Sequence, residues 1–126
     1  MRLELREDDQ GSRLFLAAFA DGRQVGRATL DFATRRPARR VLFRTAWVEP
    51  EWRSRGIGSA LVRRSEEIAA ARGYEAVDCL VRLDNPRALA LYRRLGYEPV
   101  GEEVNRYVDE SGEPVEEDCW SLRKRL

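Results

Sequence analysis

Two closely spaced glycines, Gly56 and Gly58, stand where an apolar run gives way to a segment of helical spacing, and Arg53 and Arg55 come just before them. Glycine allows a ligand to approach the backbone closely. The exposed N–H groups at a helix start, assisted by the helix dipole, favour an anion, and arginine adds positive charge around it. The pattern therefore predicts a phosphate or pyrophosphate site over residues 53–59.

Two common nucleotide-binding motifs share this glycine spacing, and both are incomplete in this chain. A Walker A loop ends in Gly-Lys-Ser or Gly-Lys-Thr, whereas Gly58 is followed here by Ser59 and Ala60 without a lysine. A dinucleotide-binding fingerprint needs a third glycine at the position that Leu61 occupies. Binding of ATP or NAD through this loop is therefore the weaker hypothesis.

A second segment, residues 84–97, contains an asparagine before a proline and a tyrosine at helical spacing. It reads Asp-Asn-Pro-Arg-Ala-Leu-Ala-Leu-Tyr-Arg-Arg-Leu-Gly-Tyr. This segment resembles the Asn-x-x-Ala-x-x-Leu-Tyr-x-x-x-Gly-[Phe/Tyr] motif of the GNAT superfamily of acetyl-CoA-dependent N-acetyltransferases. The earlier Arg-x-x-Gly-x-Gly sequence, after a strand that ends in Val-x-Pro, resembles the acetyl-CoA signature of the same superfamily. The two motifs occur in order, and the resemblance covers residues 41–122.

The resemblance implies an enzyme that transfers the acetyl group of acetyl-CoA, its co-substrate, to an amine by direct attack in a ternary complex. The pantetheine arm would pair with the strand around Val48, where a main-chain N–H would polarise the thioester carbonyl. Tyr92 would protonate the departing thiolate, which is basic enough to take a phenolic proton. The implied cofactor-binding residues are Ala46, Trp47, Val48, Arg53, Ser54, Arg55, Gly56, Ile57, Gly58, Ser59 and Asn85.

Two of these assignments have simpler alternatives. Asn85 is also the expected N-cap of a helix that begins with Pro86. Tyr92 lies at helical spacing between Ala88 and Leu95, which is equally typical of a core aromatic residue. Contact of Asn85 with the cofactor and proton transfer by Tyr92 are therefore hypotheses that rest on the family motif.

Neither motif supplies a general base. Ribosomal-protein N-terminal acetyltransferases of this superfamily carry a glutamate where this chain has Leu80, and other members carry one in the strand that here contains residues 42–44. Glu49, acting through a water molecule, is the candidate base, with Asp78 and Asp84 as alternatives, and an amine of low pKa needs no base. A catalytically inactive acyl-CoA-binding regulatory module is the competing hypothesis.

Alternating apolar positions, turn residues and helical spacing predict a mixed, mostly antiparallel α/β fold with a sheet of about seven strands and two main helices. Residues 8–12 are too few to form the helices that many GNAT proteins place after the first strand. The acceptor site would then be open or completed by a second subunit, as in a homodimer. The predicted strands are Leu3–Leu5, Leu14–Ala20, Val25–Phe32, Val41–Val48, Ala76–Val81, Val100–Tyr107 and Val115–Leu122, and the predicted helices are Ile57–Arg72 and Pro86–Leu95.

The 126 residues suit a single domain over residues 1–126, and the formal charge of +1 disfavours a general nucleic-acid binder. No apolar run approaches the length of a signal peptide or a membrane span, so we expect a cytoplasmic protein without membrane contact. Histidine is absent, and Cys79 and Cys119 lack metal-binding spacing, so we expect buried thiols and no metal site. The acidic last hairpin would attract a cationic amine or would simply be a solvated surface.

Overall fold

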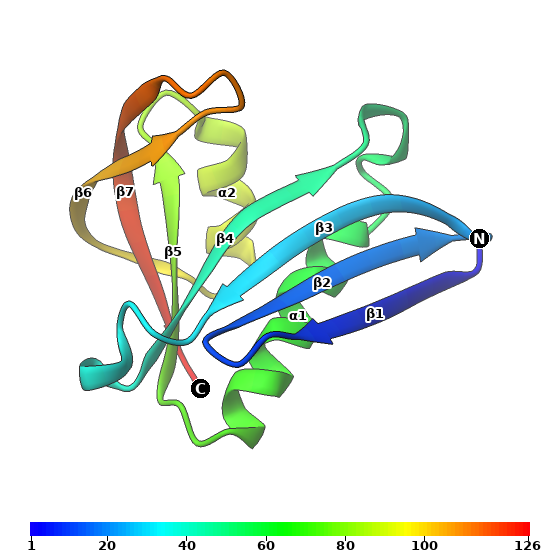
Figure 1. The fold of residues 1–126 in the computed structure, drawn as a ribbon, viewed down its shortest axis with the longest axis horizontal. Coiled ribbons are helices and arrows are strands. Elements are labelled where there is room, and N and C mark those ends of the chain that lie inside the picture. Colours follow the sequence, from blue (N-terminus) through cyan, green and yellow to red (C-terminus); the bar gives the residue numbers. More distant parts are fainter. The chain divides into compact units, whose positions relative to one another are not determined.

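The computed structural model describes residues 1–126, which divide into two compact units: Met1–Val77 with Arg125–Leu126, and Asp78–Lys124. The seven strands have the hydrogen-bonded order β1-β2-β3-β4-β5-β7-β6, and two α-helices accompany them (Figure 1). This confirms the predicted mixed, mostly antiparallel sheet with two main helices. The elements are β1 (Leu3–Asp9), β2 (Arg13–Ala20), β3 (Arg23–Asp31), η1 (Arg36–Ala38), β4 (Arg40–Val48), η2 (Pro50–Trp52), α1 (Ile57–Ala71), β5 (Ala76–Arg82), α2 (Pro86–Arg94), β6 (Glu98–Val108) and β7 (Pro114–Arg125).

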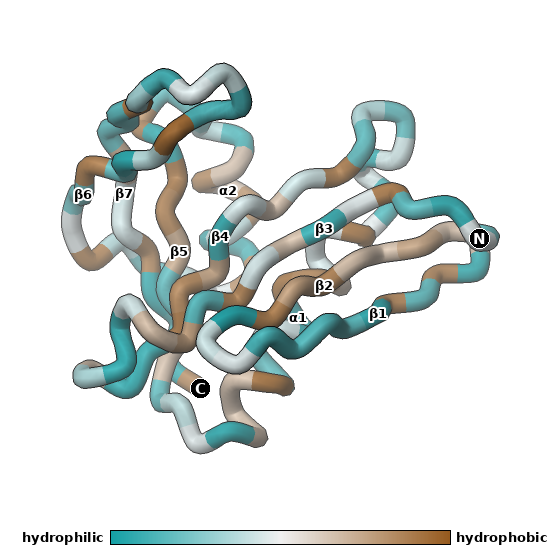
Figure 2. The backbone as a smooth tube through the Cα atoms, viewed as in Figure 1, coloured by the Kyte–Doolittle hydropathy of each residue, from teal (hydrophilic) through white to brown (hydrophobic).

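In the first unit, strands β1 to β4 pair antiparallel with their sequence neighbours, and α1 packs against β2, β3 and β4. Strand β2 buries every second residue, starting with Leu14 and Leu16, because successive side chains of a strand point to opposite faces. Helix α1 buries Ile57, Leu61 and Ile68, which lie on one face of the helix. Figure 2 shows the resulting contrast between the apolar β2 and the largely hydrophilic edge strand β1.

Strand β1 is longer than predicted, because it continues through the acidic residues that were expected to end it. Asp8 pairs with Phe15 and Asp9 with Leu14. Arg72, the C-cap residue of α1, binds the Asp9 carboxylate at 2.8 Å, so the acidic strand end has a counter-charge. The chain then turns directly into β2, and the helices that many GNAT proteins carry at this point are absent, as predicted.

The second unit contains most of β5, helix α2 and the hairpin of β6 and β7. The Asn85 side chain caps α2 by accepting a hydrogen bond from the Ala88 N–H at 3.1 Å, which confirms the predicted helix start. Lys124, the single lysine of the chain, donates from Nζ to the carbonyl oxygen of Leu95 at 2.8 Å, close to the end of α2. Both cysteines are free and buried, as expected.

A buried carboxylate, Asp31, fixes the turn at the end of β3. Its Oδ1 accepts hydrogen bonds from the N–H groups of Ala33 and Thr34 at 2.9 and 3.0 Å, and its Oδ2 accepts one from Thr34 Oγ1 at 2.6 Å. Burial by itself would raise the pKa of Asp31, but these hydrogen bonds and the nearby Arg44 guanidinium outweigh it and lower the pKa below its usual value. The ionised form of Asp31 therefore stabilises the fold.

We predict that Asp31→Asn lowers the free energy of unfolding by about 1–3 kcal/mol at pH 7, because an amide cannot accept all the bonds made by the carboxylate. The stabilisation by the ionised carboxylate is complete above the unfolded-state pKa of about 3.9 and is lost as pH falls through the lower folded-state pKa. Urea unfolding at pH 7 and pH 3 should therefore show a smaller pH dependence for Asp31→Asn than for wild type. The exposed Asp8→Asn serves as control, and equal pH dependence in Asp31→Asn and wild type would contradict the assignment.

Candidate functional site

Strand β4 changes from buried to exposed in its middle. Residues 41–43 are buried, whereas residues 45–47 are exposed. The pairing with β3 shifts between these stretches, from Thr29 opposite Arg44 to Arg27 opposite Trp47, so β4 contains an extra residue. Thr45 lies in this bulge with φ of 54°, and its Oγ1 donates to Thr29 Oγ1 at 2.8 Å. The bulge redirects the backbone immediately before the predicted pantetheine-binding residues.

Sequence reasoning missed this bulge, because a positive φ is unusual for a β-branched residue such as threonine. It also missed Gly26, which lies opposite Val48 in the pairing of β3 with β4. A Cβ atom on Gly26 would lie 3.1 Å from the Trp47 carbonyl oxygen and 3.3 Å from Ile57 Cγ2. The absence of a side chain at this position therefore lets the end of β4 and the first turn of α1 approach β3 closely.

The loop between β4 and α1 holds both predicted arginines in defined contacts. Arg53 Nε donates to the Val48 carbonyl oxygen at 3.0 Å, which ties the loop to the end of β4. The Arg55 guanidinium lies 4.9 Å from the centre of the Trp52 ring, a cation–π contact. Both side chains belong to exposed residues, so their positive charge is available beside the helix start.

The first turn of α1 is open to a ligand. Gly56 occupies the N-cap position with φ of 81° and makes no side-chain capping bond. The first backbone bond of the helix runs from the Ala60 N–H to the Gly56 carbonyl, so the N–H groups of residues 57–59 precede it. A Cβ atom on Gly56 or Gly58 would meet no other atom within 4 Å. Free N–H groups, a helix dipole and open space are the features that an anionic phosphate group requires, so this turn fits a pyrophosphate.

The first unit therefore brings together the predicted residues of β4 and the glycine loop. Glu49, the candidate base, follows β4 directly, and its N–H donates to the Val25 carbonyl at 2.8 Å. Its carboxylate Oε2 accepts a bond of 2.7 Å from Arg23 Nη2, a contact that the sequence does not indicate. Trp47 is exposed beside the Arg27 guanidinium. The residues of this group are Ala46, Trp47, Val48, Glu49, Arg53, Ser54, Arg55, Gly56, Ile57, Gly58 and Ser59.

The second unit carries the other two predicted residues, Asn85 and Tyr92. The Asn85 Oδ1 atom accepts the capping bond described above, so its NH2 group and the second lone pair of Oδ1 are left to meet a ligand. The Tyr92 ring lies edge-on to Tyr97, with ring centres 5.7 Å apart. Burial raises the pKa of Tyr92, and the nearby Cys79 thiol adds to this increase, so the phenol keeps its proton across the physiological pH range.

The two alternative base candidates are both engaged by arginine within the second unit. Asp78 is fully buried, and its Oδ1 accepts a bond of 2.8 Å from Arg123 Nε. Asp84 is exposed and accepts bonds from both Arg82 nitrogens, Nε and Nη2, at 3.0 and 2.8 Å. Neither carboxylate is therefore free to approach a ligand without giving up an ion pair.

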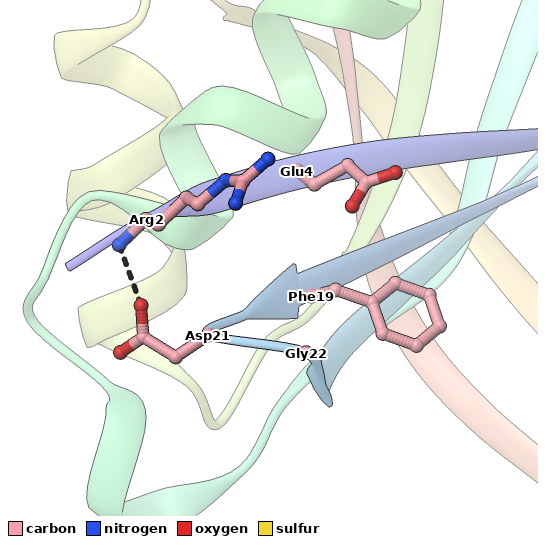
Figure 3. A pocket seen from close by; sticks show the side chains of 5 residues that line it. All are labelled: Arg2, Glu4, Phe19, Asp21 and Gly22. Carbon is pink, nitrogen blue, oxygen red and sulfur yellow. Dashed lines mark hydrogen bonds between the residues drawn. The ribbon is translucent and has the colours of Figure 1, made fainter.

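Each of the two units has a surface hollow. The hollow in the first unit, of about 460 Å³, is lined by Arg2, Glu4, Phe19, Asp21 and Gly22 and contains none of the predicted site residues (Figure 3). The Arg2 N–H donates to Asp21 Oδ1 at 2.9 Å across this hollow. The hollow in the second unit, of about 280 Å³, is strongly acidic. It is lined by Arg82, Leu83, Asp84, Glu116, Glu117 and Asp118.

The chain lacks any group of three or more His, Cys, Asp or Glu side chains arranged to hold a metal ion. No helix is both long enough and apolar enough to span a membrane.

A bulged strand thus leads directly into an open, glycine-containing helix start. The model of the acetyltransferase (GNAT) family matches residues 1–97. The chain belongs to the GNAT acetyltransferase family.

Curated relatives support this membership but are longer than the chain. The mycothiol acetyltransferase of Clavibacter michiganensis is 40% identical over 91 residues, which is 72% of this chain and 28% of the relative. An acetyltransferase of Pectobacterium atrosepticum is 33% identical over 113 residues, 90% of this chain and 65% of the relative. The crystal structure of the Escherichia coli ribosomal-protein-S18-alanine N-acetyltransferase has the same fold, with a TM-score of 0.74 at 21% identity over 94% of this chain and 72% of that one.

We predict that Gly58→Glu abolishes acetyl-CoA binding without unfolding the protein, whereas Gly58→Ala retains it. Position 58 has open space and no positive φ, so both side chains fit, but only the glutamate places a negative charge at the proposed pyrophosphate position. In a thermal-melting titration, ligand at about 100 times its dissociation constant should stabilise wild type and Gly58→Ala by about 2.7 kcal/mol. An equal stabilisation of Gly58→Glu would rule out the helix start as the cradle.

Proposed function

We propose that this chain is an N-acetyltransferase that transfers the acetyl group of acetyl-CoA to a primary amine. The observation that carries the proposal is the uncapped first turn of α1, with open space at Gly56 and Gly58, directly after the bulged strand β4. Membership of the GNAT acetyltransferase family supports acetyl-CoA as the donor.

In this proposal the first unit binds and polarises the thioester. The pyrophosphate accepts hydrogen bonds from the N–H groups at the start of α1, and Arg53 and Arg55 balance its charge. The pantetheine arm pairs with the backbone of residues 46–48, the part of β4 that follows the bulge. A main-chain N–H near Val48 then stabilises the negative charge that develops on the thioester oxygen when the amine attacks.

The chemical step moves one acetyl group and one proton. The neutral amine nitrogen attacks the thioester carbonyl carbon, the C–S bond breaks, and the sulfur leaves as a thiolate. Tyr92 donates its phenolic proton to that thiolate. The new amide nitrogen loses one proton, which balances the proton that Tyr92 donates. The raised pKa of Tyr92 means that the phenol carries a proton at every physiological pH and that it is a weaker acid than an exposed tyrosine.

Glu49 is proposed to accept the amine proton through a water molecule. It directly follows Val48, and only part of its side chain, 22%, is exposed. The Arg23 contact at 2.7 Å holds its carboxylate in one orientation. The neighbouring Glu51 also contacts Arg23, at 3.4 Å, but its side chain is 62% exposed, so it offers a matched comparison.

The acidic hollow of the second unit favours a cationic acceptor amine. Four of its six lining residues carry carboxylates and one carries a guanidinium, so the local charge is negative. Such a charge raises the local concentration of a cation before it loses its proton. The acceptor class proposed is therefore a primary amine that is protonated in solution, on a small molecule or on a peptide.

The test is release of free CoA from acetyl-CoA in the presence of a panel of such amines. We predict that Tyr92→Phe lowers kcat by about 100-fold, within the usual contribution of general acid catalysis, and leaves the affinity for acetyl-CoA unchanged. Tyr74→Phe is the control, because that tyrosine packs its ring against Phe32, with ring centres 5.4 Å apart, and lines neither hollow. Unchanged turnover of Tyr92→Phe would remove Tyr92 from the mechanism, and acetyl-CoA binding without CoA release from any amine would favour the inactive module.

We further predict that Glu49→Gln lowers kcat about 100-fold at neutral pH, because glutamine cannot accept the proton but keeps a hydrogen bond with Arg23. Glu51→Gln should retain wild-type turnover. Rates of both variants are compared from pH 6 to pH 10 with the same amine. If Glu49→Gln and Glu51→Gln show the same profile, no carboxylate of this loop acts as the base.

A further inference from the structure

Strand β6 forms one end of the strand order, so only one of its edges is paired, by β7. The other edge presents a row of backbone N–H and C=O groups that are able to pair with another strand. The strand has 11 residues, which is long for an edge strand, and it contains no lysine. Its apolar residues Val100, Val104 and Val108 are 51%, 40% and 67% exposed.

Part of this edge is regular enough to act as a template. The only register shift between β6 and β7 lies between Pro99 and Gly101, and the pairing is continuous from Gly101 to Val108. Natural edge strands are usually protected by shortness, by a bulge or by a charge directed against pairing. The bulge here protects only the start of β6. The charged residues that follow, Glu102, Glu103 and Arg106, carry both signs, so they oppose pairing with some strands and favour pairing with a strand of complementary charge.

We propose that two copies of this chain associate by antiparallel pairing of their β6 edges, centred on Val104. In an antiparallel sheet, directly opposed residues point to the same face. In a two-fold symmetric dimer, the axis must therefore pass between a residue of β6 and the same residue of the second copy. When the axis lies at Val104, the two Val104 residues, one from each copy, lie directly opposite each other. The same register places Glu102 opposite Arg106 of the second copy, and symmetry repeats this charge pair once more.

The neighbouring registers are all unfavourable. Centring on Glu102 or Glu103 opposes two glutamates, and centring on Arg106 opposes two arginines. Centring on Asn105 sets Val104 opposite Arg106 and leaves no charge pair. Like charges directly opposite destabilise a strand pair, so the sequence of β6 selects one self-complementary register.

An ion pair within each copy is compatible with this register. Arg106 pairs across the hairpin with Glu116, and their side chains meet at 3.0 Å. In the proposed dimer each Arg106 lies between Glu116 of its own chain and Glu102 of the second copy, so its charge is balanced on both sides. Gly101 opposes Tyr107 on the other face, where the missing side chain leaves room for the ring.

The first experiment is sedimentation velocity of the full chain from 1 to 200 µM. We expect a concentration-dependent dimer, which Glu102→Arg or Arg106→Glu weakens at least tenfold, because each change creates two like-charge pairs. The double variant Glu102→Arg/Arg106→Glu again places opposite charges at positions 102 and 106 of the two copies, so it should recover most of the association. Glu113→Arg, which makes the same charge change in the turn outside the paired stretch, should dimerise like wild type, and circular dichroism verifies that each variant is folded.

The second experiment reads the register directly by oxidative crosslinking. Val104→Cys should form a disulfide-linked dimer, because opposed Cα atoms lie about 4.5–5.5 Å apart, within the range that a disulfide spans. Val108→Cys is the matched control: it replaces a more exposed valine of the same strand, but its counterpart would lie about 27 Å away. A monomer at all concentrations, equal crosslinking of both cysteine variants, or charge-reversed variants that associate like wild type would each overturn the proposal.

Discussion

The close approach of three elements at Gly26 is the constraint on which the candidate site depends. A methyl group at this position would meet the Trp47 carbonyl and Ile57 at distances tighter than ordinary packing allows. The end of β4 and the first turn of α1 are therefore set by the same point of β3. Because the proposed oxyanion donor belongs to β4 and the proposed phosphate cradle to α1, the contact at Gly26 determines the spacing of these two parts of the proposed site within the first unit.

Arginine supplies the counter-charge for several carboxylates of the chain. Asp31, Asp78 and Asp84 each have a guanidinium partner, and Glu49 shares Arg23 with Glu51. A guanidinium stays charged at all physiological pH values. With no histidine present, the proposed chemistry relies on fixed backbone dipoles, on the Tyr92 phenol as acid and on the Glu49 carboxylate as base.

Much of the fold could be predicted from the sequence because local signals agreed with the tertiary structure. Gly56 at the start of α1 and Asn85 before Pro86 marked both helix starts correctly. The length of β1 was not predictable, because its acidic end is held by pairing with β2 and by Arg72, which lies far away in the sequence. The Thr45 bulge was hidden for a similar reason, since threonine does not favour the left-handed conformation that the pairing of β3 with β4 imposes there.

The use of arginine has a consequence for the chemical durability of an acetyl-CoA enzyme. Thioesters acylate exposed lysine amines without any catalyst, and each event removes a positive charge from the surface. This chain has 23 basic side chains, and Lys124 is the only one that carries an amine. That amine is partly buried and bound to the Leu95 carbonyl. The side chains therefore offer the proposed donor very few amines, and acylation leaves the arginine charges of the surface unchanged.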